Sequence, residues 1–581
     1  MTHEDEDEPG GGITVRPPAP RLPVTTLPTR QLCAAMNLDA ELRGFVLSLF
    51  LGQRHRAWGP NYGVDTTTVI RHAWRARRWQ RLRDAVLGVA LLGIVALLVL
   101  RWWSRGDLPA VATAVAWVVA AVVFHRIVRR RKGTVWKTLR SMWGKKTTGR
   151  RVLVVALFGL LASGYWLVQA LRRGDLVVAL ALLLIVLAIA LVDAFVVVRR
   201  VRAALTGGLP DGVTPLFPHD QAPALSTKRE TWLAALSDVA ESAWPSEDPH
   251  ARVIAYDLDN WREDSLKNTF VGSGFSVGDF EISIDVSKGR QTRNGKVKKS
   301  QTIDLMSLHR SLEEIALTKD LPGAWTGYRM YVDGRNLRGK NLLSEAGGRP
   351  VSWLPLDEVL AGLTGPTASL RTYQCFQVPV VNWNEKIILT LFIRADLTET
   401  NLILHTEMLM LPMMDLSGCP LIAEMPRDWW THATAAVRLG ATQVWRTSLH
   451  CFLWPLTDLR QVLRRRRAAW TVRYRLRHEQ VVSHGAFCSV RESLAEGVRV
   501  VHPNAVQDIN RTIHFLMQEL RNGLAGYLRA NDIDTSSLGE EISTVITKQK
   551  IAIDRLSADN VVIGKGKAGD TVKTAKGDTG S

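Results

Sequence analysis

The sequence predicts a membrane protein with two parts: an all-α region of four transmembrane helices in two hairpins, and a cytoplasmic α+β domain with an antiparallel sheet. Four long apolar runs lie within residues 84–198, and each is long enough to cross or nearly cross a hydrocarbon core of about 30 Å. Lysines and arginines cluster on one side of these runs, as is typical of cytoplasmic loops. Alternating apolar residues separated by turn residues follow over 327–414, which indicates an antiparallel meander.

The four predicted spans form two hairpins that resemble each other in sequence. The tetrapeptide Arg105-Gly106-Asp107-Leu108 recurs as Arg173-Gly174-Asp175-Leu176, which indicates a duplicated hairpin. Basic segments precede the first run, connect the second to the third and follow the fourth, so both termini are expected on the cytoplasmic side. The four runs are 85–103, 108–124, 152–171 and 176–198.

One acidic side chain, Asp193, lies inside a predicted span. An intramembrane carboxylate is a candidate proton or ion site, which makes a transporter or channel component one functional hypothesis. The alternative is that Asp193 lies near the cytoplasmic end of the fourth run and reaches Arg199 and the interface.

Composition limits the partners. The chain has 581 residues with 74 Lys and Arg against 55 Asp and Glu, a formal charge of +19. Basic clusters beside spans attract the anionic headgroups of a lipid bilayer, so nucleic acid is not the expected partner. Five cysteines are widely spaced and never form a CxxC pair, which gives no signal for a metal site or a disulfide. No cofactor is expected.

The rest of the chain divides by composition and pattern. The expected segments are a disordered acidic and proline-rich tail (1–29), a cytoplasmic helical region (30–83), a linker (203–226), the α+β domain (227–560) and a disordered tail (561–581). Within the α+β domain, Phe280, Ile282 and Ile284 alternate as in a strand. Residues 505–529 carry an apolar stripe at helical spacing, which indicates a core face or a short coiled coil in a homo-oligomer.

The segment VIAYDLDNW is the best candidate for catalysis. An apolar strand that ends in Asp257-x-Asp259 resembles the nucleophile strand of haloacid-dehalogenase-like phosphatases, in which Asp257 would attack phosphorus and Asp259 would act as acid and base. Asn260 departs from that motif, and a simple transition from strand to turn explains the same residues. A membrane-tethered, phosphate-handling hydrolase is therefore the alternative function, and whether the chain is an enzyme stays open.

Two basic segments are candidates for binding lipid headgroups or other anions. One is a run of four arginines beside Trp454 and Trp470, and the other follows the glycine-rich FVGSG loop. Solvated basic surfaces would give the same pattern. The candidate residues are Arg464, Arg465, Arg466, Arg467, Lys296, Lys298 and Lys299.

Several stretches together resemble one family. TRQLCAAMNLDAELRGFVLSLFLGQRHRAWGPNYGVD, the arginine-rich entry to the hairpins, FVGSG and the last amphipathic helix are similar to a group of uncharacterised multi-pass membrane proteins of actinobacteria. Thr269 stands before Phe270 where that group has proline. The resemblance carries no activity and implies a bacterial plasma membrane location. The expected function is a membrane-anchored cytoplasmic interaction or sensing module with an unknown protein partner.

Overall fold

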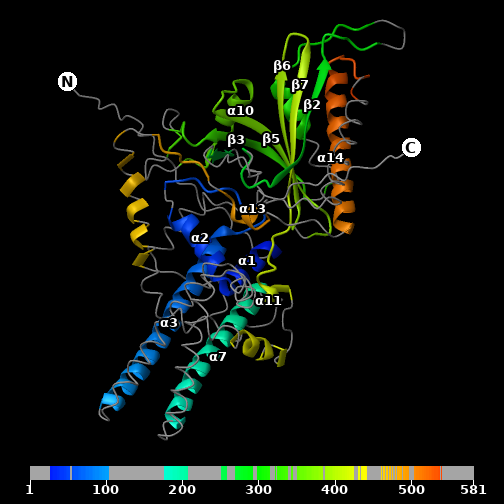
Figure 1. Cartoon of the computed structure of the whole chain (residues 1–581). Helices are drawn as coiled ribbons and strands as arrows, with labels where there is room; N and C mark the ends of the chain where they lie inside the picture. The colour runs from blue at the N-terminus through cyan, green and yellow to red at the C-terminus, as the bar shows by residue number, and fades with distance from the viewer. Residues whose placement is uncertain are drawn as a thin grey trace, which may run out of the picture.

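A computed structural model shows a mixed β-sheet with helices on one face and a separate group of long helices below it (Figure 1). The structure describes residues 26–52, 55–103, 176–206, 250–257, 269–291 and 297–313, most of 321–440 and most of 459–538.

The sheet has seven strands in the order β2-β7-β6-β5-β3-β1-β4. Neighbouring strands are antiparallel except β1 and β3, which run parallel. The predicted meander is present as β5, β6 and β7, but the parallel pair makes the sheet mixed rather than antiparallel. The strands are β1 (His250–Tyr256), β2 (Phe275–Asp285), β3 (Trp325–Asp333), β4 (Trp353–Pro355), β5 (Leu370–Pro379), β6 (Ile388–Leu397) and β7 (Asn401–Leu411).

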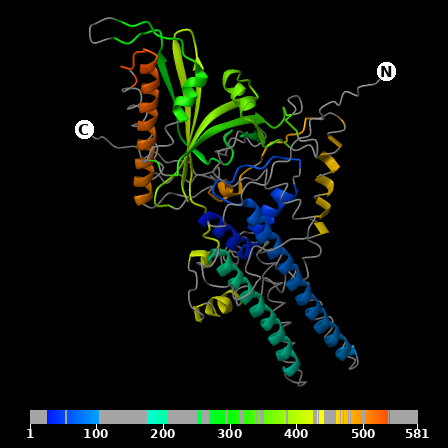
Figure 2. The same cartoon turned by 180° about the vertical axis from the view of Figure 1, so that it is seen from behind.

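One face of the sheet carries the largest hydrophobic core. The amphipathic helix α14 (Pro503–Ala530) packs there on alternate residues of β2, β6 and β7, joined by α9 (Leu305–Glu313). Helix α10 (Leu356–Thr364) packs on β1 and β3 of the same sheet. Figure 2 shows α14 in orange along the β2 edge. The stripe predicted over 505–529 is therefore a core face.

The opposite face has two different halves. Over β1, β3 and β5 it is buried beneath chain segments near residues 59–63 and 270–274 and near α13 (Val490–Ala495). Over β2, β7 and β6 many alternate residues are partly or fully exposed. Polar side chains occur in both halves, and the buried half forms the site described below.

The lower group of helices has its own core. It consists of α1 (Leu27–Leu38), α2 (Ala40–Gly52), α3 (Thr66–Trp103) and α7 (Leu176–Thr206), with the short α11 (Pro420–Ala423) beside them. Asp65 caps α3: its Oδ1 accepts hydrogen bonds from the amides of Thr67 at 3.0 Å and Thr68 at 3.2 Å. Such a cap satisfies amides that have no partner inside the helix.

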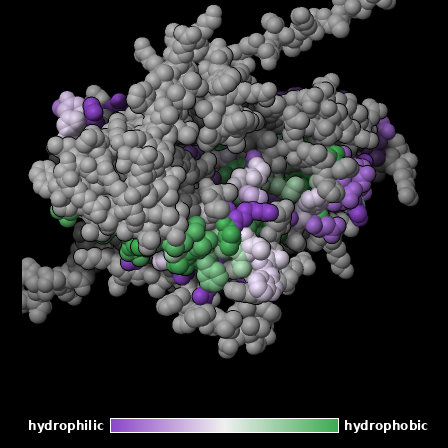
Figure 3. Space-filling model, turned by 60° about the horizontal axis from the view of Figure 1, so that its bottom comes forward, coloured by the Kyte–Doolittle hydropathy of each residue, from purple (hydrophilic) through white to green (hydrophobic). Residues whose placement is uncertain are grey.

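The prediction of a transmembrane region is wrong. In the part of the chain that the structure describes, no helix has both the length and the apolar character needed to cross a bilayer. The first and fourth predicted spans form parts of α3 and α7, and the runs 108–124 and 152–171 lie outside the described residues. The fourth run carries a buried carboxylate that pairs with α3. On the underside of the molecule, hydrophilic side chains lie beside the apolar ones (Figure 3).

The predictions that depended on this anchor are corrected with it. These are the four-helix membrane fold, the multi-pass location in a bacterial plasma membrane, and the function as a membrane-anchored interaction or sensing module. The membrane-tethered hydrolase and the transporter or channel component are set aside for the same reason. What remains to be explained is the mixed sheet and its associated helices.

Candidate functional site

Two arginines on neighbouring strands lie on the same face of the sheet. Arg252 of β1 and Arg329 of β3 are register partners in the parallel pair, so their side chains leave the sheet on one side. Both are buried, at 8% and 3% exposure. Arginine is rarely buried to this extent unless it is paired, so the surroundings of Arg329 need an explanation.

Arg329 is held by aromatic rings and one amide. Its guanidinium carbon lies 4.5 Å from the ring centre of Tyr62 and 4.8 Å from that of Trp325. Its Nη2 donates to Gln377 Oε1 at 3.2 Å. Within the described residues its Nη1 has no hydrogen-bond partner, and no carboxylate forms an ion pair with it. The guanidinium is thus a buried positive charge with no negatively charged partner among the described residues.

Three hydroxyl groups share this environment. Tyr62 Oη, Ser273 Oγ and Tyr331 Oη are buried, and none makes a hydrogen bond of normal geometry to the described part of the chain. Burial raises the pKa of both tyrosines, an effect that the charge of Arg329 opposes. Both tyrosines are therefore neutral hydrogen-bond donors. We refer to Tyr62, Ser273, Arg329 and Tyr331 as the Arg329 site.

The charge of Arg329 is stable in spite of burial. Burial lowers its pKa, and Cys375, Tyr62 and Tyr331 oppose that effect where they are ionised, well above neutral pH. At neutral pH the guanidinium keeps its proton because arginine is not deprotonated in proteins. Burial raises the pKa of the Cys375 thiol to about 11, so this thiol carries its proton at neutral pH. The site therefore combines one permanent cation with neutral donors.

The segment that carries Tyr62 is fixed by hydrogen bonds to a distant part of the chain. Asn61 Oδ1 accepts from Ser489 Oγ at 2.8 Å and from the amide of Arg491 at 3.1 Å. Arg491 also donates to the carbonyl oxygen of Tyr62 and, at 3.0 Å, to that of Lys386. These bonds fix Tyr62 above the face of the sheet, and their partners Ser489 and Arg491 do not belong to the sheet.

The glycine-rich loop supplies Ser273. Gly272 has a φ of +88°, and a Cβ at this position would lie 2.4 Å from the carbonyl oxygen of Pro60, so only glycine fits. The amide of Gly272 donates to Glu492 Oε2 at 2.9 Å, and that of Ser273 to the carbonyl of Phe270 at 3.0 Å. These two amides are thus occupied within the protein, and the loop contributes a side chain to the site.

Aromatic residues enclose the site. Phe270 stacks on Phe392 with ring centres 4.1 Å apart and meets Tyr331 and Tyr373 edge to face at 4.9 Å and 5.0 Å. Rings packed in this way keep the local dielectric constant low, which strengthens the interaction of Arg329 with any negative charge.

The structure places the predicted catalytic carboxylate elsewhere. Asp257 follows β1, is 6% exposed and forms an ion pair with Arg56. Asp259 lies outside the described residues. In the described part of the chain, no group of three or more His, Cys, Asp or Glu side chains could hold a metal ion.

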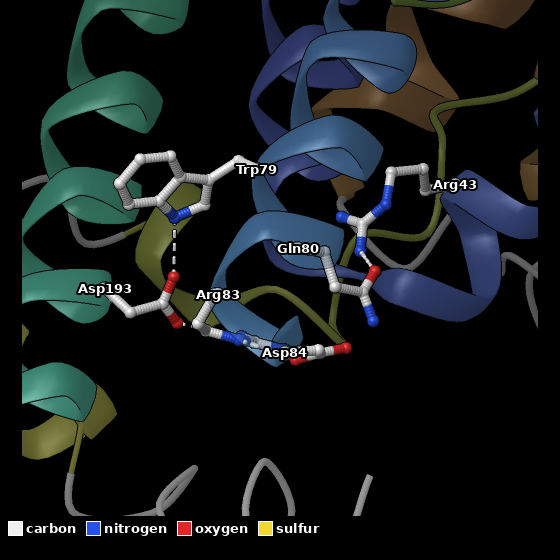
Figure 4. Close-up of polar contacts among 6 residues, drawn as sticks. All are labelled: Arg43, Trp79, Gln80, Arg83, Asp84 and Asp193. Atoms are coloured by element: carbon white, nitrogen blue, oxygen red, sulfur yellow. Dashed lines mark hydrogen bonds and ion pairs between the residues drawn. The ribbon is translucent and has the colours of Figure 1, made fainter. Parts of the chain in front are cut away.

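Asp193 joins two helices (Figure 4). From α7 it accepts hydrogen bonds from Trp79 Nε1 at 2.7 Å and from Arg83 Nη1 at 2.8 Å, both on α3. Arg83 also binds Asp84 at 2.7 Å, and Arg43 donates to Gln80 nearby. The carboxylate is 3% exposed, and these contacts give it a role in holding α3 against α7.

The predicted basic residues do not gather around Arg329. Lys298 pairs with Asp532 at 2.9 Å just beyond α14, and Lys299 is exposed. Arg464, Arg466 and Arg467 lie exposed on a different segment. Lys296 and Arg465 fall outside the described residues.

Sequence reasoning missed the Arg329 site because its parts are far apart in the chain. Tyr62, Ser273 and Arg329 come from three segments separated by many residues, and each looks ordinary in its own context. The available signal was the arginine within GYRMYVDG, a charged residue inside a predicted strand of a sheet core.

Comparison with known proteins gives one finding on family. Residues 282–566 match a family model described as the AbeC-like domain. This range includes Arg329 and Tyr331, whereas Tyr62 and Ser273 lie before it. No curated protein and no solved structure matches the chain. From β2 to beyond α14, the chain is therefore similar to the AbeC-like domain family, whose description names no activity.

Proposed function

We propose that the chain binds a small anion at the Arg329 site. The observation that carries the proposal is the buried guanidinium of Arg329, which has no counter-charge among the described residues. It lies beside three buried hydroxyl groups that make no hydrogen bond of normal geometry to the described residues. Such a group of donors matches the hydrogen-bonding needs of an anion.

The energetics favour a ligand over a purely structural role. An unpaired buried charge costs several kcal/mol after relaxation, that is about 3 kcal/mol or more. The rings of Tyr62 and Trp325 lie within cation–π range and offset about 1–2 kcal/mol each. An anion would contribute charge-assisted hydrogen bonds of about 1.5–3 kcal/mol each. These bonds would offset the part of the burial penalty of Arg329 that the two rings do not.

The chemistry of the site favours a carboxylate or phosphate group. A guanidinium matches the paired oxygens of either group, and the neutral hydroxyls of Tyr62, Ser273 and Tyr331 can each donate one further hydrogen bond. Arg252 on the adjacent strand adds a second positive charge to the same face.

Calorimetric titration of the purified full-length protein tests the proposal. Inorganic phosphate, sulfate and acetate would be titrated separately in a buffer free of other small anions. We expect at least one of them to bind the wild type, and Arg329→Met to abolish that binding. Tyr331→Phe and Ser273→Ala should each weaken it about fivefold to twelvefold, because each loses one hydrogen bond of about 1–1.5 kcal/mol.

The matched control is Arg521→Met, which removes the same charge from an exposed position of α14. It should bind like the wild type. Equal binding by the wild type and Arg329→Met, or no binding of any of the three anions by the wild type, would show the proposal to be wrong.

A further inference from the structure

The open half of the sheet carries a pair of carboxylates without a cation. Asp279 of β2 and Glu407 of β7 are register partners. They lie on the face opposite α14, since Met408, which adjoins Glu407 in β7, is in the core beneath α14 and successive side chains of a strand alternate between faces. No basic side chain of the described residues forms an ion pair with either. Burial, and then the charge of Asp279, raises the pKa of Glu407 to about 7.

Further acidic residues extend this surface. Glu281 and Asp396 lie 3.5 Å and 3.3 Å from the ring nitrogens of His405, and Asp396 also pairs with Arg394. We call the exposed side of β2, β7 and β6 the acidic face. Among the described residues, carboxylates outnumber cations on this face, so its charge is negative at neutral pH.

A second unpaired surface has the opposite charge. Most of residues 459–475 are described as helical, and this sequence has no acidic residue. Its exposed large apolar side chains include two pairs four residues apart: Leu459 and Leu463 at 56% and 55%, and Trp470 and Tyr474 at 65% and 47%. Val462 is also exposed, at 42%. Exposed arginines without an ion pair among the described residues flank them: Arg460, Arg464, Arg466, Arg467 and Arg475. We call this segment the basic helix.

The two surfaces lie apart within one chain. The basic helix, gold in Figures 1 and 2, lies on the side of the molecule away from β2 and α14 in both views. The basic helix therefore lies away from β2 of the same chain, and each of the two surfaces has the charge that the other lacks.

We propose that the basic helix of one copy docks on the acidic face of a second copy, with its arginines against Asp279 and Glu407. A guanidinium would satisfy both carboxylates at once, and the docked helix would cover Leu463 and Trp470. Because the two surfaces differ, the contact is heterologous and leaves a free helix and a free face at the ends of an assembly. Association should therefore rise with protein concentration and fall with salt.

Sedimentation velocity of the full chain at increasing concentration, at low and at high salt, tests this proposal. Two charge-reversed variants are compared with the wild type. The helix variant carries Arg464→Glu, Arg466→Glu and Arg467→Glu, and the face variant carries Asp279→Lys and Glu407→Lys. We expect each variant alone to associate at least tenfold more weakly, and an equal mixture of the two to associate like the wild type, because opposite charges then face each other again.

The control, Arg521→Glu with Arg529→Glu on α14, makes a similar change of charge at exposed positions and should associate normally. A wild type that stays monomeric, unchanged association of the helix variant, or a mixture that fails to associate would overturn the proposal. If the wild type is monomeric and its basic helix binds nucleic acid or anionic vesicles, the proposal is also overturned, and the basic helix has a different partner.

Discussion

Replacement of Arg329 by methionine distinguishes the effect of the buried charge on folding stability from its effect on anion binding. The guanidinium is 3% exposed and lacks an ionic partner among the described residues. Methionine has a similar length, keeps contact with Tyr62 and Trp325, and removes the buried charge. Replacing a buried charge by an apolar side chain of similar volume is often neutral or stabilising by about 1–4 kcal/mol. The substitution loses the hydrogen bond to Gln377, worth about 1 kcal/mol.

We therefore expect Arg329→Met to unfold with a free energy equal to that of the wild type or up to about 3 kcal/mol higher in a buffer without small anions. Urea denaturation followed by tryptophan fluorescence measures this difference. With a saturating anion present, the order should reverse, because the ligand stabilises only the wild type. A loss of more than 2 kcal/mol without anion would refute the reasoning, since it would mean that the charge is already compensated inside the protein.

Three further predictions concern other parts of the fold. Asp193→Asn keeps an acceptor for Trp79 but leaves Arg83 with Asp84 alone, and we expect urea denaturation to show a loss of about 1–3 kcal/mol. Gly272→Ala places a Cβ 2.4 Å from a backbone oxygen at a φ of +88°, so a loss of about 1–3 kcal/mol is expected in the same assay. The raised pKa of Glu407, about 7, means that wild-type stability falls as the pH rises from about 4.5 to 7. Glu407→Gln should remove about 1 kcal/mol of that fall once solvent screening is allowed for, and an unchanged pH profile would contradict the assignment.

Local patterns predicted the elements that depend on local sequence. The stripe over 505–529 gives α14, and the alternation that includes Ile282 and Ile284 gives β2. Each of these follows from spacing along one stretch of chain. The parallel pairing of β1 with β3 does not, because strands that run parallel are joined by a long connection that leaves no short-range signal.

The membrane prediction failed because an apolar run does not reveal what it packs against. The apolar run 176–198 predicts a membrane-spanning helix, with Asp193 within it as a candidate proton or ion site. In the structure, Asp193 binds Arg83 and Trp79, which lie more than one hundred residues earlier in the chain. A buried ion pair of this kind marks an interface between two helices, and only the tertiary contact identifies it.

The Arg329 site also connects the two groups of helices and strands. Tyr62 belongs to the segment between α2 and α3, whereas Arg329 belongs to the sheet. A bound anion would contact both and would stabilise the folded chain by RT ln(1 + [L]/Kd), about 2.7 kcal/mol at a hundredfold excess over Kd. Because Asn61 and Arg491 already fix the Tyr62 segment, this stabilisation would act on the contact between the lower helices and the sheet. Anion binding and the docking of the lower helices are therefore expected to be thermodynamically coupled.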